Sequence, residues 1–138
     1  SSAASDVYKR QVDETEEQYF LVHRTATTPF NAEVYKVLLN GKYKCFAVVI
    51  EHTLTKKSIV ELRFSGKNDA ISFAHEFVSV LNNAKSLDEL DYEIGILFSK
   101  WRKKKTLLSK KFLNKYFGDS YFVHELFGEF FEQELVSQ

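Results

Sequence analysis

The dipeptide Asn40-Gly41 constrains the fold of this chain more than any other short feature, because it lies between two strand-like segments, 34–39 and 45–50. A two-residue type I′ turn requires positive φ at both central positions, which Asn and Gly adopt more easily than other residues. The dipeptide therefore predicts a tight β-hairpin with a defined register. Its expected cross-strand pairs are Leu39 with Lys42, Val37 with Lys44 and Tyr35 with Phe46.

Two further segments, 18–25 and 58–64, alternate in the manner of strands. Segment 45–50 is continuously apolar, which is typical of a central strand covered on both faces. Four such segments joined by short turns predict an antiparallel meander in the first half of the chain.

From residue 68 onward the hydrophobic period changes to three and four, which indicates helices. The first helix is expected to end near residue 83, with Asn68 or Asp69 as its N-cap. Ser86 and Glu89 match a capping box, so a second helix is expected to begin there.

The remaining helices are expected in the last third of the chain. Segment 107–117 predicts a third helix, or a continuation of the second, closed by Gly118. Segment 121–135 predicts a last helix that Gly128 weakens. Its expected inward residues are Val123, Phe127, Phe130 and Phe131.

The sequence thus predicts an α+β fold, in which an antiparallel β-meander of about four strands is packed by a helix and followed by a helical C-terminal part of two to three helices. We expect residues 12–138 to form a single domain. Residues 12–84 would supply the meander and its helix, and residues 85–138 the helical extension.

The first residues have a different origin in this interpretation. Residues 6–11 read Asp-Val-Tyr-Lys-Arg-Gln, which is the translation of GATGTGTATAAGAGACAG, a transposon end used to prepare sequencing libraries. We therefore expect residues 1–11 to be adapter translation rather than native protein, as in metagenomic sequence. The chain contains no Met, which agrees with a native N-terminus that has been truncated.

Charge and composition exclude several classes of protein. The chain has 19 basic and 19 acidic residues, so its net charge gives no reason to expect a polyanionic partner. The single Cys45 lies among apolar residues and is expected to be a buried hydrophobe. The longest apolar runs are too short for a membrane span and no signal peptide is visible, so a soluble, cytoplasmic protein is expected.

The motifs of catalysis and metal binding are incomplete. His75-Glu76 and His124-Glu125 begin the zinc-hydrolase pattern, but Ser79 and Gly128 stand where the second His is required. The glycines are too far apart for a phosphate-binding loop. We therefore expect no enzyme, no metal, no cofactor and no small-molecule ligand.

One local feature is not explained by composition: residues 100–115, the basic segment, contain eight basic residues and no acidic one. Such a cluster can neutralise phosphates, while an aromatic ring can stack on a base. The candidate nucleic-acid-binding residues are Lys100, Trp101, Arg102, Lys103, Lys104, Lys105, Lys110, Lys111, Lys115 and Tyr116.

Two other interpretations of the basic segment remain open at this point. Its lysines can be a solvated helix end, with Trp101 facing the core. Alternatively, the acidic stretch that begins at Asp119 can dock on it within the same chain.

The topology of a meander followed by a helix is similar to that of double-stranded-RNA-binding modules, and pleckstrin-homology-like domains also end in a strand and an amphipathic helix. A double-stranded-RNA module would open its last helix with a lysine-rich loop where this chain has residues 65–70. Only Lys67 is basic there, so that phosphate clamp is absent. A shared topology does not define a function.

The sequence therefore favours a non-catalytic binding module that contacts nucleic-acid phosphates through the basic segment. The alternative is a protein-interaction or structural module that uses the Phe-rich acidic C-terminal helix, or a fragment of a larger protein. In that case the partner is another protein or a second copy of the chain.

Overall fold

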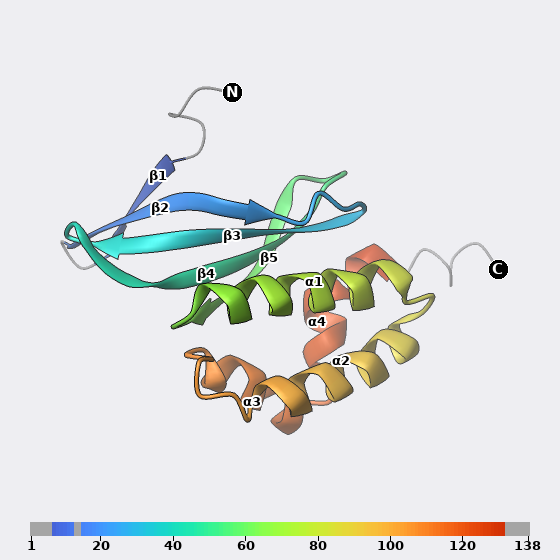
Figure 1. Ribbon diagram of the computed structural model, residues 1–138. Coiled ribbons are helices and arrows are strands. Elements are labelled where there is room, and N and C mark those ends of the chain that lie inside the picture. Colours follow the sequence, from blue (N-terminus) through green and yellow to red (C-terminus); the bar gives the residue numbers. More distant parts are fainter. Residues whose placement is uncertain (1–6, 13–14, 132–138) are drawn as a thin grey trace.

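The computed structural model describes residues 7–12 and 15–131, with side chains from residue 16 onward (Figure 1). Five strands come first: β1 (Val7–Val12), β2 (Thr15–Arg24), β3 (Phe30–Leu39), β4 (Lys42–His52) and β5 (Lys57–Phe64). Four helices follow: α1 (Lys67–Asn83), α2 (Leu87–Trp101), α3 (Lys110–Gly118) and α4 (Phe122–Phe131). The predicted α+β class is confirmed.

The strands form one antiparallel sheet in the order β1-β2-β3-β4-β5. The four strands expected from the sequence are β2 to β5, and they form the predicted meander. The additional strand β1 is built almost entirely from residues assigned above to adapter translation, and that assignment stays a prediction. The remaining residues of the adapter segment lie outside the described chain.

The Asn40-Gly41 hairpin is confirmed, since both residues have positive φ (52° and 83°) and Leu39 pairs with Lys42. The two other expected pairs are wrong by one residue, because a β-bulge makes Lys44 an extra residue in β4. The observed pairs are Val37 with Cys45 and Tyr35 with Ala47. The shift sends Phe46, Val48 and Ile50 to the face that the helices cover.

All four helices lie on one face of the sheet (Figure 1). α1 packs directly on β3, β4 and β5. α2 packs against α1, and α4 packs against α2 and β5. The core between these layers is rich in aromatic side chains that meet edge to face. Its largest fully buried members include Phe64, Phe73, Phe77, Phe98, Trp101 and Phe127.

Of the two predicted helix N-caps, one is confirmed and the other is wrong. Ser86 caps α2 as predicted, its Oγ accepting a hydrogen bond from the Glu89 N–H at 3.1 Å. The predicted cap of α1 is wrong: Gly66 is the N-cap, because the carboxylate of Asp69 instead accepts a hydrogen bond from Thr106 Oγ1 at 2.6 Å.

The last two helices agree with expectation in part. α3 begins at Lys110 rather than near residue 107, because the preceding residues pair with the edge of β5. α3 ends at Gly118, the residue predicted to close it, and the C-cap is Asp119 in an extended conformation. In α4 the buried residues are Phe122, Val123, Phe127 and Gly128. Phe130 and Phe131 also face inward as predicted, packed against the core but only partly buried. Residues 132–135 of the predicted last helix lie outside the described chain.

Candidate nucleic-acid interface

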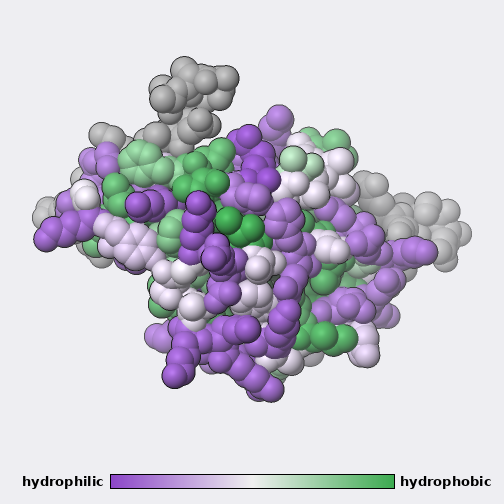
Figure 2. Space-filling view, in the orientation of Figure 1, coloured by the Kyte–Doolittle hydropathy of each residue, from purple (hydrophilic) through white to green (hydrophobic). Residues whose placement is uncertain are grey.

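The basic segment is a helix end, a loop and a second helix rather than one continuous helix. Lys100 and Trp101 end α2, Arg102 is its C-cap, and residues 103–105 belong to the loop that leads to α3. Lys110, Lys111 and Lys115 lie on α3. Figure 2 shows hydrophilic side chains gathered over the lower part of the molecule, where Figure 1 places α2, α3 and the loop between them.

The loop between α2 and α3 is attached through its C-terminal residues to the end of β5. The Ser65 N–H donates to the Thr106 carbonyl and the Leu108 N–H to the Arg63 carbonyl, each at 2.8 Å. The Arg63 N–H donates in turn to Ser109 Oγ at 2.8 Å. Between these bonds the side chain of Leu107 is buried in the main core. The loop lysines, residues 103–105, lie between the end of α2 and this attachment, where the Lys104 N–H donates to the Trp101 carbonyl at 3.0 Å.

Trp101 is a core residue, only 2% exposed. Its ring meets Phe64 and Phe73 edge to face, and its Nε1–H donates to Oε1 of Glu76 at 2.9 Å. The ring is therefore not placed to stack on a base, and the core-facing interpretation describes it correctly. The same carboxylate pairs with Lys100 Nζ at 3.0 Å, so Lys100 is neutralised within the chain.

Tyr116 joins α3 to α2. Its hydroxyl donates to the Asp91 carbonyl at 2.9 Å, and its ring packs edge to face on Phe98. The close approach needs a glycine on α2, since a Cβ at Gly95 would lie 2.7 Å from the Tyr116 hydroxyl oxygen. Burial raises the pKa of this hydroxyl. Tyr116 thus serves helix packing and offers little free ring surface.

The other seven basic residues of the segment have no carboxylate within 4.0 Å among residues 16–131. Arg102 lies over the Phe117 ring at 4.1 Å, Lys104 lies 5.8 Å from the Trp101 ring, and Lys110 Nζ donates to the Arg102 carbonyl. These contacts orient the side chains without neutralising them. The seven residues are Arg102, Lys103, Lys104, Lys105, Lys110, Lys111 and Lys115, of which only Lys110 is half-buried.

The start of α3 adds positive potential to this surface. Lys110 and Lys111 are its first two residues, and its first turn contains no acidic residue. The Ser109 hydroxyl accepts from Arg63 and makes no capping bond to the helix. Cations at a helix N-terminus oppose the helix dipole and cost roughly 0.3–1 kcal/mol each. Lysines placed only for solubility would avoid this position, whereas a phosphate group is stabilised there.

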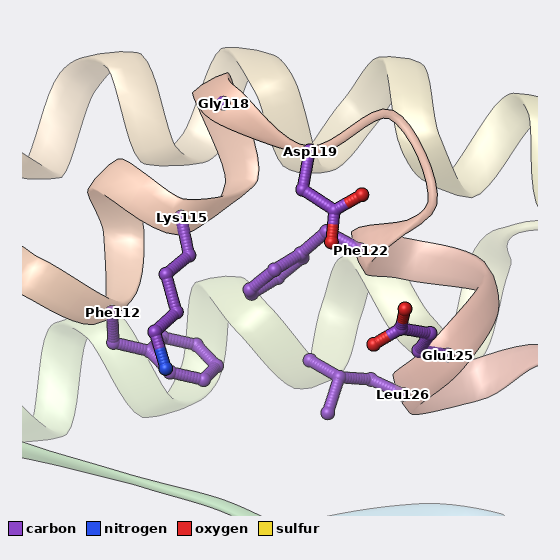
Figure 3. Close-up of a pocket in the computed structure, with 7 residues that line it drawn as sticks. All are labelled: Phe112, Lys115, Gly118, Asp119, Phe122, Glu125 and Leu126. Atoms are coloured by element: carbon purple, nitrogen blue, oxygen red, sulfur yellow. The ribbon is translucent and has the colours of Figure 1, made fainter.

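The acidic C-terminal stretch does not neutralise the basic segment in the described part of the chain. Glu129 of α4 instead pairs with Lys57 of β5 at 2.7 Å. A surface hollow of about 470 Å³ does separate α3 from α4, and Figure 3 shows Lys115 on one side of it and Asp119 and Glu125 on the other. Its floor is apolar, formed by Phe112, Phe122 and Leu126.

A second charged cluster lies on the sheet face opposite the helices. The buried carboxylate of Glu17 accepts two hydrogen bonds from Arg63, each at 3.0 Å, and pairs with Lys44 at 2.8 Å. The bonds from Arg63 hold the pKa of Glu17 at about 2, although burial acts in the opposite direction. Burial raises the pKa of the neighbouring Cys45 thiol, so Cys45 is the inert hydrophobe that was predicted. Every buried polar side-chain atom of the described residues has a hydrogen-bond partner, which indicates a structural network.

Sequence reasoning missed the residues that position the basic segment. Glu76, Asp69 and Ser109 hold it by side-chain hydrogen bonds to partners that are 25, 37 and 46 residues away. Each looks like an ordinary surface residue in the sequence, and no local spacing distinguishes it.

Comparisons with protein-family models, with curated proteins and with solved structures found no match to this chain. Within the described residues, no helix has the length and apolar character needed to cross a membrane. The same residues contain no group of three or more His, Cys, Asp or Glu side chains that could hold a metal ion.

Proposed function

We propose that this chain is a non-catalytic binding module that contacts nucleic-acid phosphates through the basic segment. The observation that carries the proposal is the set of seven cationic side chains that have no carboxylate partner in the described chain and lie together on the end of α2, on α3 and on the loop between them. A cation that is already paired with a carboxylate neutralises no phosphate. An unpaired cation can neutralise a phosphate and so release a counterion condensed on the nucleic acid.

Phosphates are the expected contact, and bases are not. Trp101 is buried in the core and Tyr116 is engaged with α2, so neither of the two candidate aromatic rings supports stacking. Binding through Lys and Arg to phosphates is tolerant of sequence and strongly dependent on salt. The proposed module therefore binds nucleic acid by charge, with little discrimination between bases.

The alternative of a protein partner for the C-terminal helix has less support. Phe122, Val123 and Phe127 of α4 are buried in the chain's own core, and Leu126, Phe130 and Phe131 are partly buried against it, so little apolar surface of the described part of this helix is left for a partner.

The test is fluorescence anisotropy of labelled single- and double-stranded oligonucleotides titrated with the full chain at several salt concentrations. We expect affinity to fall steeply with salt, and the variant Lys103→Glu, Lys104→Glu, Lys105→Glu to reduce the slope by up to about 3 for duplex DNA. The matched control reverses the same charge on three exposed lysines elsewhere, Lys36→Glu, Lys42→Glu, Lys56→Glu.

A large loss in the first variant and a small one in the control would support the proposal. Equal losses would mean that only net charge matters. Absence of binding at low salt would contradict the proposal and favour a protein partner.

A further inference from the structure

Two histidines from distant parts of the sequence meet on the surface of the molecule. His23 of β2 and His75 of α1 face each other with their Nε2 atoms 2.8 Å apart and their ring centroids 5.0 Å apart. One Nε2 therefore donates its N–H to the lone pair of the other, so both Nε2 atoms point at the same small volume. His75 is exposed and His23 is partly exposed, so solvent reaches the pair.

A β-bulge creates this meeting. Leu21 pairs with Tyr35 and His23 with Val34, so Val22 is an extra residue in β2. Strict alternation would put His23 on the same face as Leu21, away from the helices. The bulge instead aligns it with Val34, whose side chain belongs to the helix-side core. Bulges commonly re-aim a side chain next to a functional site.

The distance between the two nitrogens suits a shared metal ion. Imidazole nitrogen binds Zn²⁺ at about 2.0–2.1 Å, so two such ligands at tetrahedral angles lie roughly 3.3 Å apart. The observed 2.8 Å needs an opening of about half an ångström, which side-chain rotation of an exposed ring can supply. The ion would replace the shared proton between the rings.

The surroundings leave the two rings available. Among the hydrogen bonds of residues 16–131, the bond between the two Nε2 atoms is the one in which either ring takes part. The adjacent Glu76 is engaged with Lys100 and Trp101, which cancels the charge of Lys100. His75 is exposed and His23 partly exposed, so water can reach the ion and complete its coordination.

The geometry points to His23 and His75 as a two-imidazole binding site for a divalent late transition-metal ion such as Zn²⁺, Ni²⁺ or Cu²⁺, with water in the remaining positions. Imidazole is the ligand type these ions share, whereas Mg²⁺ and Ca²⁺ require oxygen ligands. The site is independent of the basic segment and does not rest on the proposed function.

The experiment is isothermal titration of the full chain, prepared without a polyhistidine tag, with ZnCl₂, NiCl₂ and MgCl₂. We expect one Zn²⁺ or Ni²⁺ per chain and no binding of Mg²⁺. His23→Gln and His75→Gln should each weaken Zn²⁺ affinity by about tenfold or more. His124→Gln, on the exposed side of α4, is the matched control and should leave the affinity unchanged.

A second measurement separates a lost ligand from a lost fold. In nitrogen-15 spectra of the imidazole groups, Zn²⁺ should shift the resonances of His23 and His75 and leave those of His52 and His124 in place. The inference is overturned if Zn²⁺ does not bind at about 1 mM, or if folded His23→Gln and His75→Gln variants bind it as tightly as the unaltered chain.

Discussion

Glu17 on β2 and Arg63 on β5 are joined by two hydrogen bonds although two strands lie between them. Strands three places apart in a flat sheet are separated by about 14 Å, so this pair spans most of the sheet's width. At this level β4 carries the small buried residues Cys45 and Ala47, which leave room for the long side chains to lie across it. The two residues thus connect the edge strand β5 to the far side of the meander.

This pair makes stability depend on pH in the acid range. The pKa of Glu17 is about 2 in the folded chain against an ordinary 4.5, so its contribution is present in full above about pH 4.5. Protonation on going down toward pH 2 removes that contribution. We expect the free energy of unfolding in urea to fall between about pH 4.5 and pH 2, and to fall less in Glu17→Gln. Equal pH dependence in both chains would contradict the assignment to Glu17.

Removal of the Glu17 charge at neutral pH should also be costly. Glu17→Gln leaves the partly buried guanidinium of Arg63 without its main partner, and we expect a loss of about 2–3 kcal/mol in the free energy of unfolding. Glu33→Gln is the control, because its partner Arg24 is 52% exposed at the side chain and such pairs contribute under about 1 kcal/mol. Similar losses in the two variants would show that burial of Glu17 does not increase the contribution of its ion pair to the free energy of unfolding.

The packing of α3 on α2 can be tested at two glycines. Gly95→Ala would place a Cβ 2.7 Å from the Tyr116 hydroxyl oxygen, so we expect destabilisation by about 1 kcal/mol or more. Gly118→Ala is the control, since nothing lies within 4 Å of its added Cβ and Ala favours the helix. Tyr116→Phe should restore most of the stability lost in Gly95→Ala. If it does not, the hydroxyl is not the group that Gly95 accommodates.

The adapter interpretation predicts that residues 1–11 are dispensable for folding. The larger core described above begins at Val22 and includes no described residue before it. A chain that starts at Val12 should therefore keep its far-ultraviolet circular dichroism and unfold in one cooperative transition, with β2 as the sheet edge in place of the β1 pairing. Loss of cooperative unfolding would show that residues 1–11 belong to the folded unit.

The features predicted from the sequence were those set by local chemistry. The Asn40-Gly41 turn and the Ser86 cap depend on neighbouring residues, and both are present. The bulges at Lys44 and Val22 were not predictable, because each resolves a conflict between strand alternation and the face that the helices must cover.

In the candidate site, too, local features were predictable from the sequence and tertiary contacts were not. The charge of the basic segment can be counted in the sequence. Whether the Trp101 ring faces the core or the solvent depends on tertiary contacts, and the structure buries it. The helical stripe of α2 was compatible with either a core or a surface position for its ring. Glu76 and Phe73 of α1 supply the partners that decide it.

The attachment of the loop after α2 to the end of β5 has an entropic consequence. Its backbone conformation is selected when the chain folds, through the bonds at Thr106, Leu108 and Ser109. A polyanion that binds there has to order only the lysine side chains, each at a cost of up to about 2 kcal/mol, and not the main chain that carries them. Charge on a loop held in this way is pre-organised, so more of its attraction is retained as affinity.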